Sequence, residues 1–298
     1  MAKPTKSKLK IEQYHLHKDK PEKLQFEIYS LHQYLAKNIG HTDKPHFHSF
    51  YQIIWFTKGK GKHFVDFNEY EVSENKMFFI SKNQIHYFDG NINYEGVIIH
   101  FNENFIIDNE NDIDIFLKYN IFNDFESEPV FTIQKNTIEN FSNLVSQLKN
   151  EIATPNNFAH KDFLKYLLKL FLISIQRIGK RNNCKNLSVK NQSHLTFIKF
   201  RQLLETNFRK VHTVSEYANL LNTSTKTLTN HTKEIAHKTP LEIVNERIIL
   251  EARRLLSHSS FNINEIGFQL GYEDPSYFVK FFKRQTKKSP SDFRKAIS

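Results

Sequence analysis

The sequence has little of what several protein classes require. It contains a single cysteine, Cys184, which excludes a disulfide framework and is typical of a reducing cytoplasm. Its most apolar stretch, residues 163–178, carries Lys165 and Lys169 and is too short to cross a bilayer, and we expect no signal peptide. It also lacks a Walker loop, a dinucleotide-binding glycine fingerprint and a nucleophile–base arrangement. These absences disfavour secreted proteins, membrane proteins and the commonest enzymes, and they predict a cytoplasmic chain without a cofactor.

Positive charge is distributed unevenly along the chain. The whole sequence of 298 residues has a net charge of +10, from 42 lysines and arginines and 32 aspartates and glutamates. Residues 190–298 hold 18 of these basic and 10 of these acidic residues, so +8 falls in this segment and only +2 in the rest. The length suggests two domains. A basic excess confined to one of them predicts a surface that binds nucleic-acid phosphates.

A helix-turn-helix pattern occurs twice in the basic segment. Residues 264–290 have the pattern of a helix, a glycine turn and a second helix with a basic face, and a looser copy lies about fifty residues earlier. In the alignment of the two copies, Ala218 falls on Gly267, where two helices cross, and Asn222 falls on Gly271, where the turn needs a positive φ. Capping boxes are expected at Thr213/Glu216, Thr239/Glu242 and Asn262/Glu265, and caps before proline at Asp274 and Ser289. We predict helices near residues 193–209, 214–221, 225–236, 240–257, 263–270, 275–286 and 290–297.

The second helix of each copy is expected to read DNA. Lysine suits guanine acceptors, asparagine suits adenine, and threonine or valine can meet a thymine methyl group. The predicted DNA-contacting residues are Thr225, Lys226, Thr229, Asn230 and Lys233 in the first copy and Ser276, Tyr277, Val279, Lys280, Lys283 and Arg284 in the second. Lys287 and Lys288 are expected to meet phosphate. The alternative is a merely solvated basic face. Leu220 and Phe268 are predicted to lie in the core.

The second copy resembles the signature of the AraC/XylS family. The matching residues are Ile266-Gly267-Phe268 through Gly271-Tyr272, Ser276-Tyr277-Phe278, Phe281-Phe282-Lys283, Ser289-Pro290 and Phe293-Arg294. The first copy departs from the family at Thr232, where an aromatic core residue is usual, and at Asn222, which replaces glycine. The resemblance implies a bacterial transcription regulator, by family habit an activator, with a variable sensing domain in front.

The preceding segment has the pattern of a β-domain. Short apolar runs separated by polar turns predict strands at residues 51–56, 63–67, 70–72, 77–80, 85–88 and 96–101, typical of a sandwich or small barrel. The family resemblance implies a cupin-like barrel, with His46, His48 and His86 at its histidine positions and Gln52 near the position of the cupin acidic ligand. The aromatic residues predicted to fill the barrel are Phe50, Trp55, Phe64, Phe79 and Tyr87.

The histidine pattern leaves three readings open. His46 and His48 alternate along one strand, so both can point into a barrel, and three histidines are a plausible metal set. The amide of Gln52 is a weak ligand, however, and lacks the negative charge of a carboxylate. We therefore expect no bound metal, and predict that His46, His48, Gln52 and His86 line the pocket of an organic effector; the remaining reading is a hydrogen-bonded core.

The remaining segments complete a five-part organisation. Helices near 136–153 and 158–178 are expected, and the family resemblance implies that such a pair forms a homodimer contact; the alternative is packing against the barrel. We predict a flexible arm at 1–20, a sensing barrel at 21–135, a helical dimerisation segment at 136–178, a linker at 179–193 and a DNA-binding domain at 194–298.

The sequence thus predicts an α+β protein that regulates transcription. A homodimer would bind half-sites in double-stranded promoter DNA, and a small-molecule effector or a change in dimer geometry would decide whether RNA polymerase is recruited or blocked. Two alternatives remain: a metal-dependent cupin enzyme with a helical appendage, against which the amide at Gln52 counts, and a non-specific architectural DNA protein, which would need no duplicated recognition helix.

Overall fold

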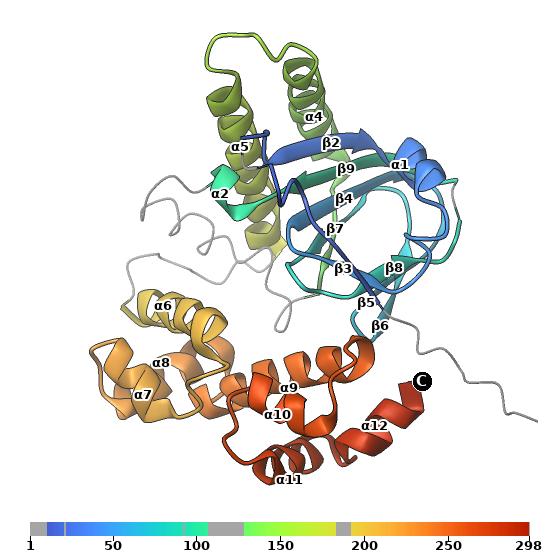
Figure 1. Cartoon of the computed structure of the whole chain (residues 1–298). Coiled ribbons are helices and arrows are strands. Elements are labelled where there is room, and N and C mark those ends of the chain that lie inside the picture. The colour runs from blue at the N-terminus through green and yellow to red at the C-terminus, as the bar shows by residue number, and fades with distance from the viewer. Residues whose placement is uncertain (1–10, 21, 92, 107–127, 183–191, 298) are drawn as a thin grey trace, which may run out of the picture. The chain divides into compact units, whose positions relative to one another are not determined.

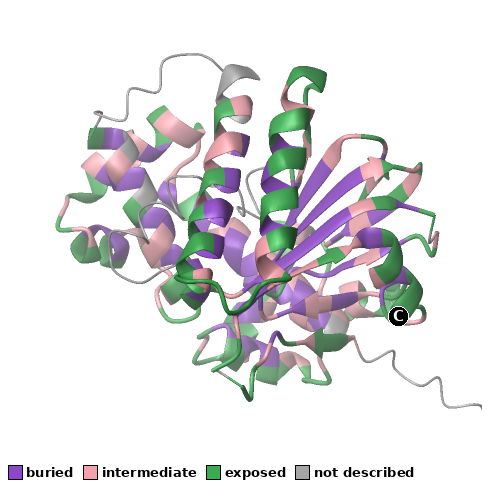
Figure 2. Ribbon diagram, turned by 90° about the horizontal axis from the view of Figure 1, so that it is seen from above, coloured by how far each residue is buried: buried purple, intermediate pink, exposed green. Residues whose placement is uncertain are grey.

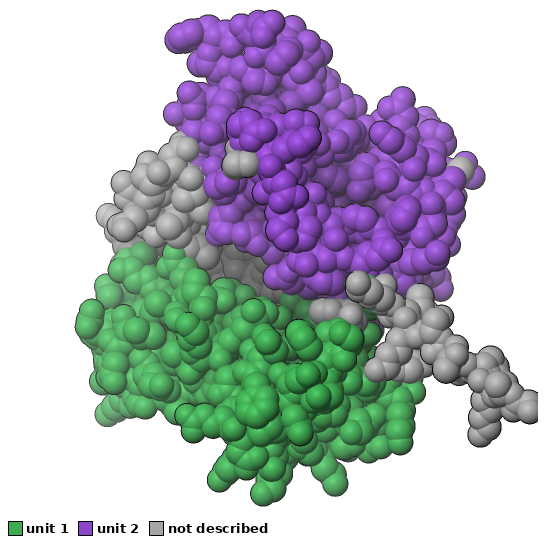
Figure 3. Space-filling view, viewed as in Figure 1, with its two compact units in different colours: residues 1–11, 186–298 green, residues 12–185 purple. Residues whose placement is uncertain are grey.

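The computed structural model describes residues 11–20, 22–91, 93–106, 128–182 and 192–297 (Figure 1). The chain divides into two compact units, one spanning Glu12–Lys185 and the other containing the segment Asn186–Ser298 (Figure 3). The first unit is rich in strands and the second is helical, which confirms the predicted α+β class. No helix within the described ranges is long and apolar enough to span a membrane.

The described residues of the first unit form two five-stranded sheets. The first sheet has the order β1 (Glu12–Tyr14), β3 (His46–His48), β8 (His86–Phe88), β5 (Gly61–Val65) and β6 (Asn68–Val72). The second has the order β10 (Val130–Thr132), β7 (Lys76–Ile80), β4 (Tyr51–Lys58), β9 (Glu95–Phe101) and β2 (Phe26–Ser30). The β1–β3 pair is parallel and the other pairs are antiparallel. Strands β4 to β9 account for the six predicted runs.

The second sheet is buried on both faces. Alternate side chains of a strand point to opposite faces, and Ile54 and Phe56 of β4 enter a core shared with Val65 and Phe88 of the first sheet. The short helix α1 (Leu31–Lys37) adds to this inner core. The other face of the sheet packs on α4 (Ile138–Ile152) and α5 (His160–Asn182), which Figure 2 shows beside the mostly buried strands. Two short helical turns, α2 (Glu103–Ile106) and η1 (Lys135–Thr137), precede α4 in the sequence.

Most of the aromatic residues that were predicted to fill the barrel lie elsewhere. Trp55 and Phe79 are buried, but in the core between the second sheet and the helices rather than inside the barrel. Phe64 and Tyr87 are half-buried and stack on each other, with ring centroids 4.4 Å apart. Only Phe50 approaches the interior, where its ring stacks on His48. For Trp55 and Phe79 the prediction failed because both faces of β4 and β7 are apolar, so alternation alone could not show which face is inside.

Strand β1 and the end of helix α5 fall within segments that were predicted to be a flexible arm and a linker. Residues 12–14 form β1 beside β3, and the backbone carbonyl of Leu16 accepts a hydrogen bond from Asn102, so the flexible arm cannot extend to residue 20. Helix α5 continues to Asn182, four residues past its predicted end at 178. Cys184 and the rest of 183–191 lie outside the described residues.

The second unit confirms the seven predicted helices. They are α6 (Gln192–Asn207), α7 (Val214–Leu220), α8 (Thr225–Ala236), α9 (Pro240–His258), α10 (Ile263–Gln269), α11 (Pro275–Thr286) and α12 (Pro290–Ile297). All three capping boxes are formed, and Asp274 accepts a hydrogen bond from the Ser276 amide. The two turns have positive φ, 50° at Asn222 and 84° at Gly271. A Cβ on Gly271 would lie 1.9 Å from the Arg209 carbonyl oxygen, so the second turn requires glycine.

Helix α9 joins the two copies. Its buried residues Ile243, Val244 and Ile248 begin an apolar stripe that continues through Ala252 and Leu256. The prediction that Leu220 and Phe268 lie in the core is wrong, since their exposed fractions are 51% and 57%. They stand at the ends of the short helices α7 and α10, which have too few turns to bury more than one side.

A buried ion cluster ties α9 to the end of α6. The Glu251 carboxylate accepts hydrogen bonds from Arg209 at 2.6 Å and Arg247 at 3.1 Å, and Arg254 lies 3.9 Å away. The guanidinium of Arg247 also stacks 3.9 Å from the Phe208 ring centroid. Burial by itself would raise the pKa of Glu251, but the guanidinium groups of Arg247, Arg254 and Arg209 outweigh it and lower the pKa to about 2.

We predict that Glu251→Gln lowers the free energy of unfolding of the helical unit by about 3 kcal/mol at neutral pH, because it leaves buried guanidinium groups without their counter-ion. The folded-state pKa of about 2 lies below the ordinary value of 4.5, so this stabilisation is present above pH 4.5 and is lost as the pH falls toward 2. Urea unfolding followed by far-UV circular dichroism at several pH values measures both effects.

A matched control lies on the same helix. Glu246 forms an exposed ion pair with Lys238 at 2.7 Å, so Glu246→Gln should cost under about 1 kcal/mol. The only tryptophan, Trp55, is in the other unit, and its fluorescence should report unchanged unfolding of the barrel. Equal losses for the two glutamate variants would contradict the assignment.

Candidate nucleic-acid interface and barrel histidine site

The two predicted recognition helices have the same division into buried and exposed faces. In α8 the buried residues are Leu228 and Thr232, and in α11 they are Phe278, Phe281 and Phe282. Thr232 replaces an aromatic residue without leaving its hydroxyl unpaired, since it donates to the Thr229 carbonyl at 3.1 Å. The first copy therefore retains a recognition helix despite its departures from the signature.

None of the eleven predicted DNA-contacting residues is buried. Thr229 and Val279 are half-buried and the other nine are exposed, including Tyr277 with an exposed fraction of 68%. The Lys280 ammonium lies 5.8 Å from the Tyr277 ring centroid, so these two side chains share one patch of the α11 surface. Each helix ends at a residue in the left-handed conformation, His237 for α8 and Lys287 for α11. The repeated geometry places a polar and basic face on each copy.

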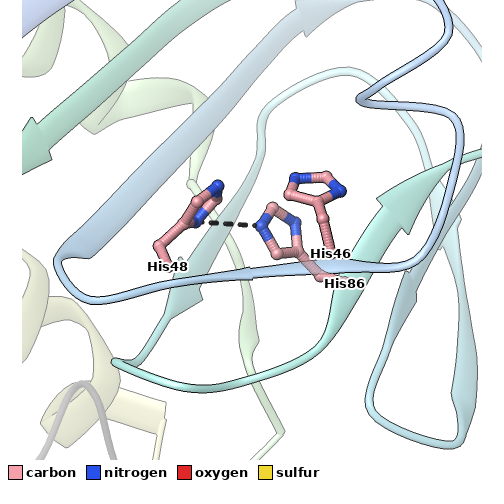
Figure 4. Close-up of side chains that lie close together, drawn as sticks. All are labelled: His46, His48 and His86. Atoms are coloured by element: carbon pink, nitrogen blue, oxygen red, sulfur yellow. Dashed lines mark hydrogen bonds between the residues drawn. The ribbon is translucent and has the colours of Figure 1, made fainter. Parts of the chain in front are cut away.

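The barrel brings the three sequence-predicted histidines together. His46 and His48 point inward from β3, and His86 points inward from β8, which pairs with β3 at the His46–His86 position. Their ring centroids lie 4.4 to 5.0 Å apart, and all three side chains are buried. Figure 4 shows the three rings facing one another.

A chain of contacts orients these rings. His46 Nδ1 lies 2.8 Å from the Lys44 carbonyl oxygen, which can only accept, so Nδ1 carries the proton and Nε2 keeps its lone pair. His48 Nδ1 and His86 Nε2 share a hydrogen bond of 3.2 Å. On its other side, His86 Nδ1 lies 3.4 Å from His63 Nε2.

The structure adds two histidines that sequence reasoning missed. His63 points inward from β5, and His100 points inward from β9, where its ring centroid is 6.1 Å from that of His48. Alternation along the strands could have identified both residues. His63 lies two positions before the inward-facing Val65, and His100 lies two positions after the inward-facing Ile98. Gln52, the fourth predicted site residue, pairs with His100 and Ile80 on the second sheet and shares the inner face of β4 with Ile54 and Phe56.

Burial favours the neutral form of the interior histidines. Burial lowers the pKa of His63 and of His100 to about 3, with a further contribution from the charge of His46. Burial likewise holds the pKa values of His48 and His86 well below 6.5, and it lowers that of His46. Neutral imidazoles can bind a metal or accept a hydrogen bond from a ligand without first losing a proton.

Unpartnered polar atoms gather in this interior. Both amide atoms of Gln52, Nδ1 of His63 and Nε2 of His100 are buried without a hydrogen-bond partner among the described residues. A buried polar group left unpaired costs about 1–3 kcal/mol, so such groups rarely gather without a function. The interior therefore has the polar groups of a ligand site.

Comparisons with known proteins match both units. Residues 32–167 match the family described as AraC-like ligand binding domain, and residues 217–296 match the family described as Helix-turn-helix domain. The chain is 26% identical over 178 residues to Histidine kinase P4 of Formosa agariphila, covering 57% of this chain but only 13% of that protein. It is 21% identical over 252 residues to the HTH-type transcriptional activator RhaS of Escherichia coli, covering 84% of this chain and 86% of that protein. The structure of ToxT from Vibrio cholerae O395 aligns with 93% of this chain and 99% of that chain, with 17% identity and a TM-score of 0.42.

The two family matches fall on the two units that the structure separates, one on each. The signature residues of the second copy form the helix pair α10 and α11, and the looser first copy forms the corresponding pair α7 and α8. The chain belongs to the AraC/XylS family of transcriptional regulators.

Proposed function

We propose that the protein is a sequence-specific regulator of transcription that acts in the cytoplasm and binds promoter DNA through α8 and α11. The observation that carries this proposal is the pair of capped helices, each exposing a polar and basic face and both packed on α9. Such helices fit the major groove, where side chains reach base edges. The eleven exposed or half-buried residues of these faces are the proposed contacts.

The proposed regulatory step places an effector in the barrel. A small molecule that hydrogen-bonds His46, His48, Gln52 or His86 would favour one arrangement of the protein on DNA, by its difference in affinity for the two arrangements. The relative RhaS is named a transcriptional activator, and this supports recruitment of RNA polymerase over its exclusion. The helical unit is then the output domain of a regulator rather than an appendage of an enzyme.

We further propose that the protein works as a homodimer joined through α5. One face of this helix packs on the barrel through Leu164, Leu168 and Phe171. The opposite face exposes Phe163, Tyr166 and Leu170, with exposed fractions of 47%, 65% and 47%. Residues spaced by three and four positions form one stripe along a helix, so an apolar surface remains for a second copy.

DNA binding should reside in the helical unit. A fragment of residues 186–298, which holds the basic excess and both recognition helices, should shift duplex DNA drawn from a randomised pool in a gel-shift assay. A fragment of residues 12–185 should not. Equal binding by the two fragments would sink the assignment.

Lys280 should contribute to sequence reading, whereas Lys287 should contribute to affinity alone. Lys280 lies mid-helix on the exposed face of α11, and Lys287 caps its end. Lys280→Ala should cost about 1–3 kcal/mol on the selected site and relax the preference at one base position. Lys287→Ala should weaken binding to all sequences alike and reduce the salt dependence by about one unit. Repeating the selection with each variant measures both effects, and an unchanged preference and affinity for Lys280→Ala would refute its role.

Charge placed on the α5 stripe should separate the dimer. The double variant Tyr166→Glu/Leu170→Glu should halve the mass measured by light scattering, because two carboxylates would be buried at the interface without partners. Gln147→Glu, an exposed position on α4, adds a charge outside the stripe and should leave the mass unchanged. A wild-type protein that is monomeric at micromolar concentration would remove the proposal.

A further inference from the structure

We propose that His46, His48 and His86 form a binding site for one divalent transition-metal ion of the zinc class inside the barrel. The three side chains offer ligand nitrogens that all lie within 4.8 Å of one another. Imidazole suits zinc, copper, iron and nickel, whereas magnesium and calcium prefer oxygen ligands. The imidazole donors therefore favour a transition metal such as zinc over magnesium or calcium.

The spacing of the nitrogens is close to that of a bound ion. Zinc–nitrogen bonds of about 2.0–2.1 Å in a tetrahedral arrangement place ligand nitrogens roughly 3.3 Å apart. The edge from His48 Nδ1 to His86 Nε2 is already 3.2 Å. The other edges lie within the 4.8 Å limit, so closure asks for ring movements of no more than about 1.5 Å.

Hydrogen-bond partners around the rings orient them, as they do for the ligand histidines of metal proteins. His46 donates Nδ1–H to the Lys44 carbonyl, which leaves its Nε2 for a metal. If His86 Nε2 binds the ion, its Nδ1 carries the proton and can donate to His63 Nε2, 3.4 Å away. Backing of a ligand histidine by a hydrogen-bond acceptor is the usual arrangement in metal proteins. Here two of the three proposed ligands have it.

The three rings turn ligand nitrogens toward one another inside the barrel (Figure 4). The only alternative use of the facing lone pairs within the described residues is the single hydrogen bond between His48 and His86. A metal would use all three rings at once.

The amide of Gln52 does not count against this site. The expectation of a metal-free barrel rested on Gln52, whose amide is a weak ligand and lacks the negative charge of a carboxylate. In the structure Gln52 lies on the facing sheet opposite His100 and Ile80, so the three histidines form a set without it. Sites with three histidine ligands hold zinc and leave the fourth position to water or to an anion. An effector with an anionic group could take that position.

The site rests on geometry alone, while its regulatory meaning rests on the proposed function. The test therefore uses the full-length protein and two separate readouts. After treatment with a chelator and gel filtration, Zn²⁺ is added and bound metal is measured by equilibrium dialysis with elemental analysis. Binding of the selected DNA duplex is measured with and without Zn²⁺. Co²⁺ replaces Zn²⁺ in a parallel sample, because its visible absorption reports the coordination geometry.

We expect the wild type to bind one zinc ion per chain. His46→Ala and His86→Gln should each reduce the zinc affinity by about 100-fold or more. Losing a ligand should cost more than losing a hydrogen-bond partner of a ligand, which typically costs about 10–100-fold. His100→Gln is the matched control, since His100 is equally buried in the same interior but stands outside the set. It should bind zinc as the wild type does. Circular dichroism and Trp55 fluorescence verify that each variant is folded.

Each outcome decides one of the two claims. Both the site and its role are supported if zinc binding is lost in the ligand variants and kept in His100→Gln, and if zinc changes the DNA affinity by about fivefold or more. A fivefold change is the low end of ordinary allosteric coupling. If the variants bind zinc in this way but zinc leaves the DNA affinity unchanged, the metal site is supported and a role for the metal in regulation is overturned. Zinc stoichiometry equal in wild type and ligand variants, or lost equally in His100→Gln, overturns the site, while DNA binding by the metal-free protein still tests the proposed function.

Discussion

Burial of both faces of the second sheet is the constraint on which the N-terminal unit depends. Along β4, Trp55 enters the core beneath α4 and α5, while Ile54 and Phe56 enter the barrel. A slip of one residue would exchange the two sets and move Gln52 out of the interior, so the register is strongly specified. That register also decides which polar groups lose water. His100 shares the inner face with Gln52, and both face the histidines of the first sheet. Desolvation then lowers the pKa values of the histidines and favours the neutral imidazole, which is the form that binds a ligand.

In the helical unit the corresponding role belongs to α9. Its apolar stripe packs against helices of both copies, and the Glu251 cluster fixes it to the segment after α6. A buried carboxylate held by several guanidinium groups is costly to form but more costly to break, so it specifies one arrangement of neighbouring helices. Because Leu228 and Phe278 pack on the inner faces of α8 and α11, the outward faces of these helices can carry polar side chains.

The two units carry different kinds of site. The proposed DNA-contacting residues of α8 and α11 are exposed or half-buried, so their chemistry lies in side chains that water already solvates. The barrel site is enclosed, and its unpartnered atoms at Gln52, His63 and His100 are a cost that a pure scaffold would avoid. A ligand or ion that satisfies such atoms stabilises the state to which it binds, and this difference in affinity is the only means by which it can bias the state of the protein on DNA.

The sequence by itself determined the helical unit almost completely. Caps such as Thr213 with Glu216, and turn residues such as Gly271, act over a few positions, so helix ends, the duplicated motif and the exposed faces follow from local spacing. It also determined the strands, and that His46 and His48 share a face. The family resemblance placed His86 with them, and the pairing of β3 with β8 brings it there. Only the tertiary structure decided that His63 and His100 belong to the same interior, that Trp55 and Phe79 face the helices, and that Leu220 and Phe268 are exposed. The physical reason is that alternation along a strand shows which side chains share a face, but not which face is enclosed. When both faces are apolar, that is decided only by the pairing of distant strands and by the packing of helices on the sheet.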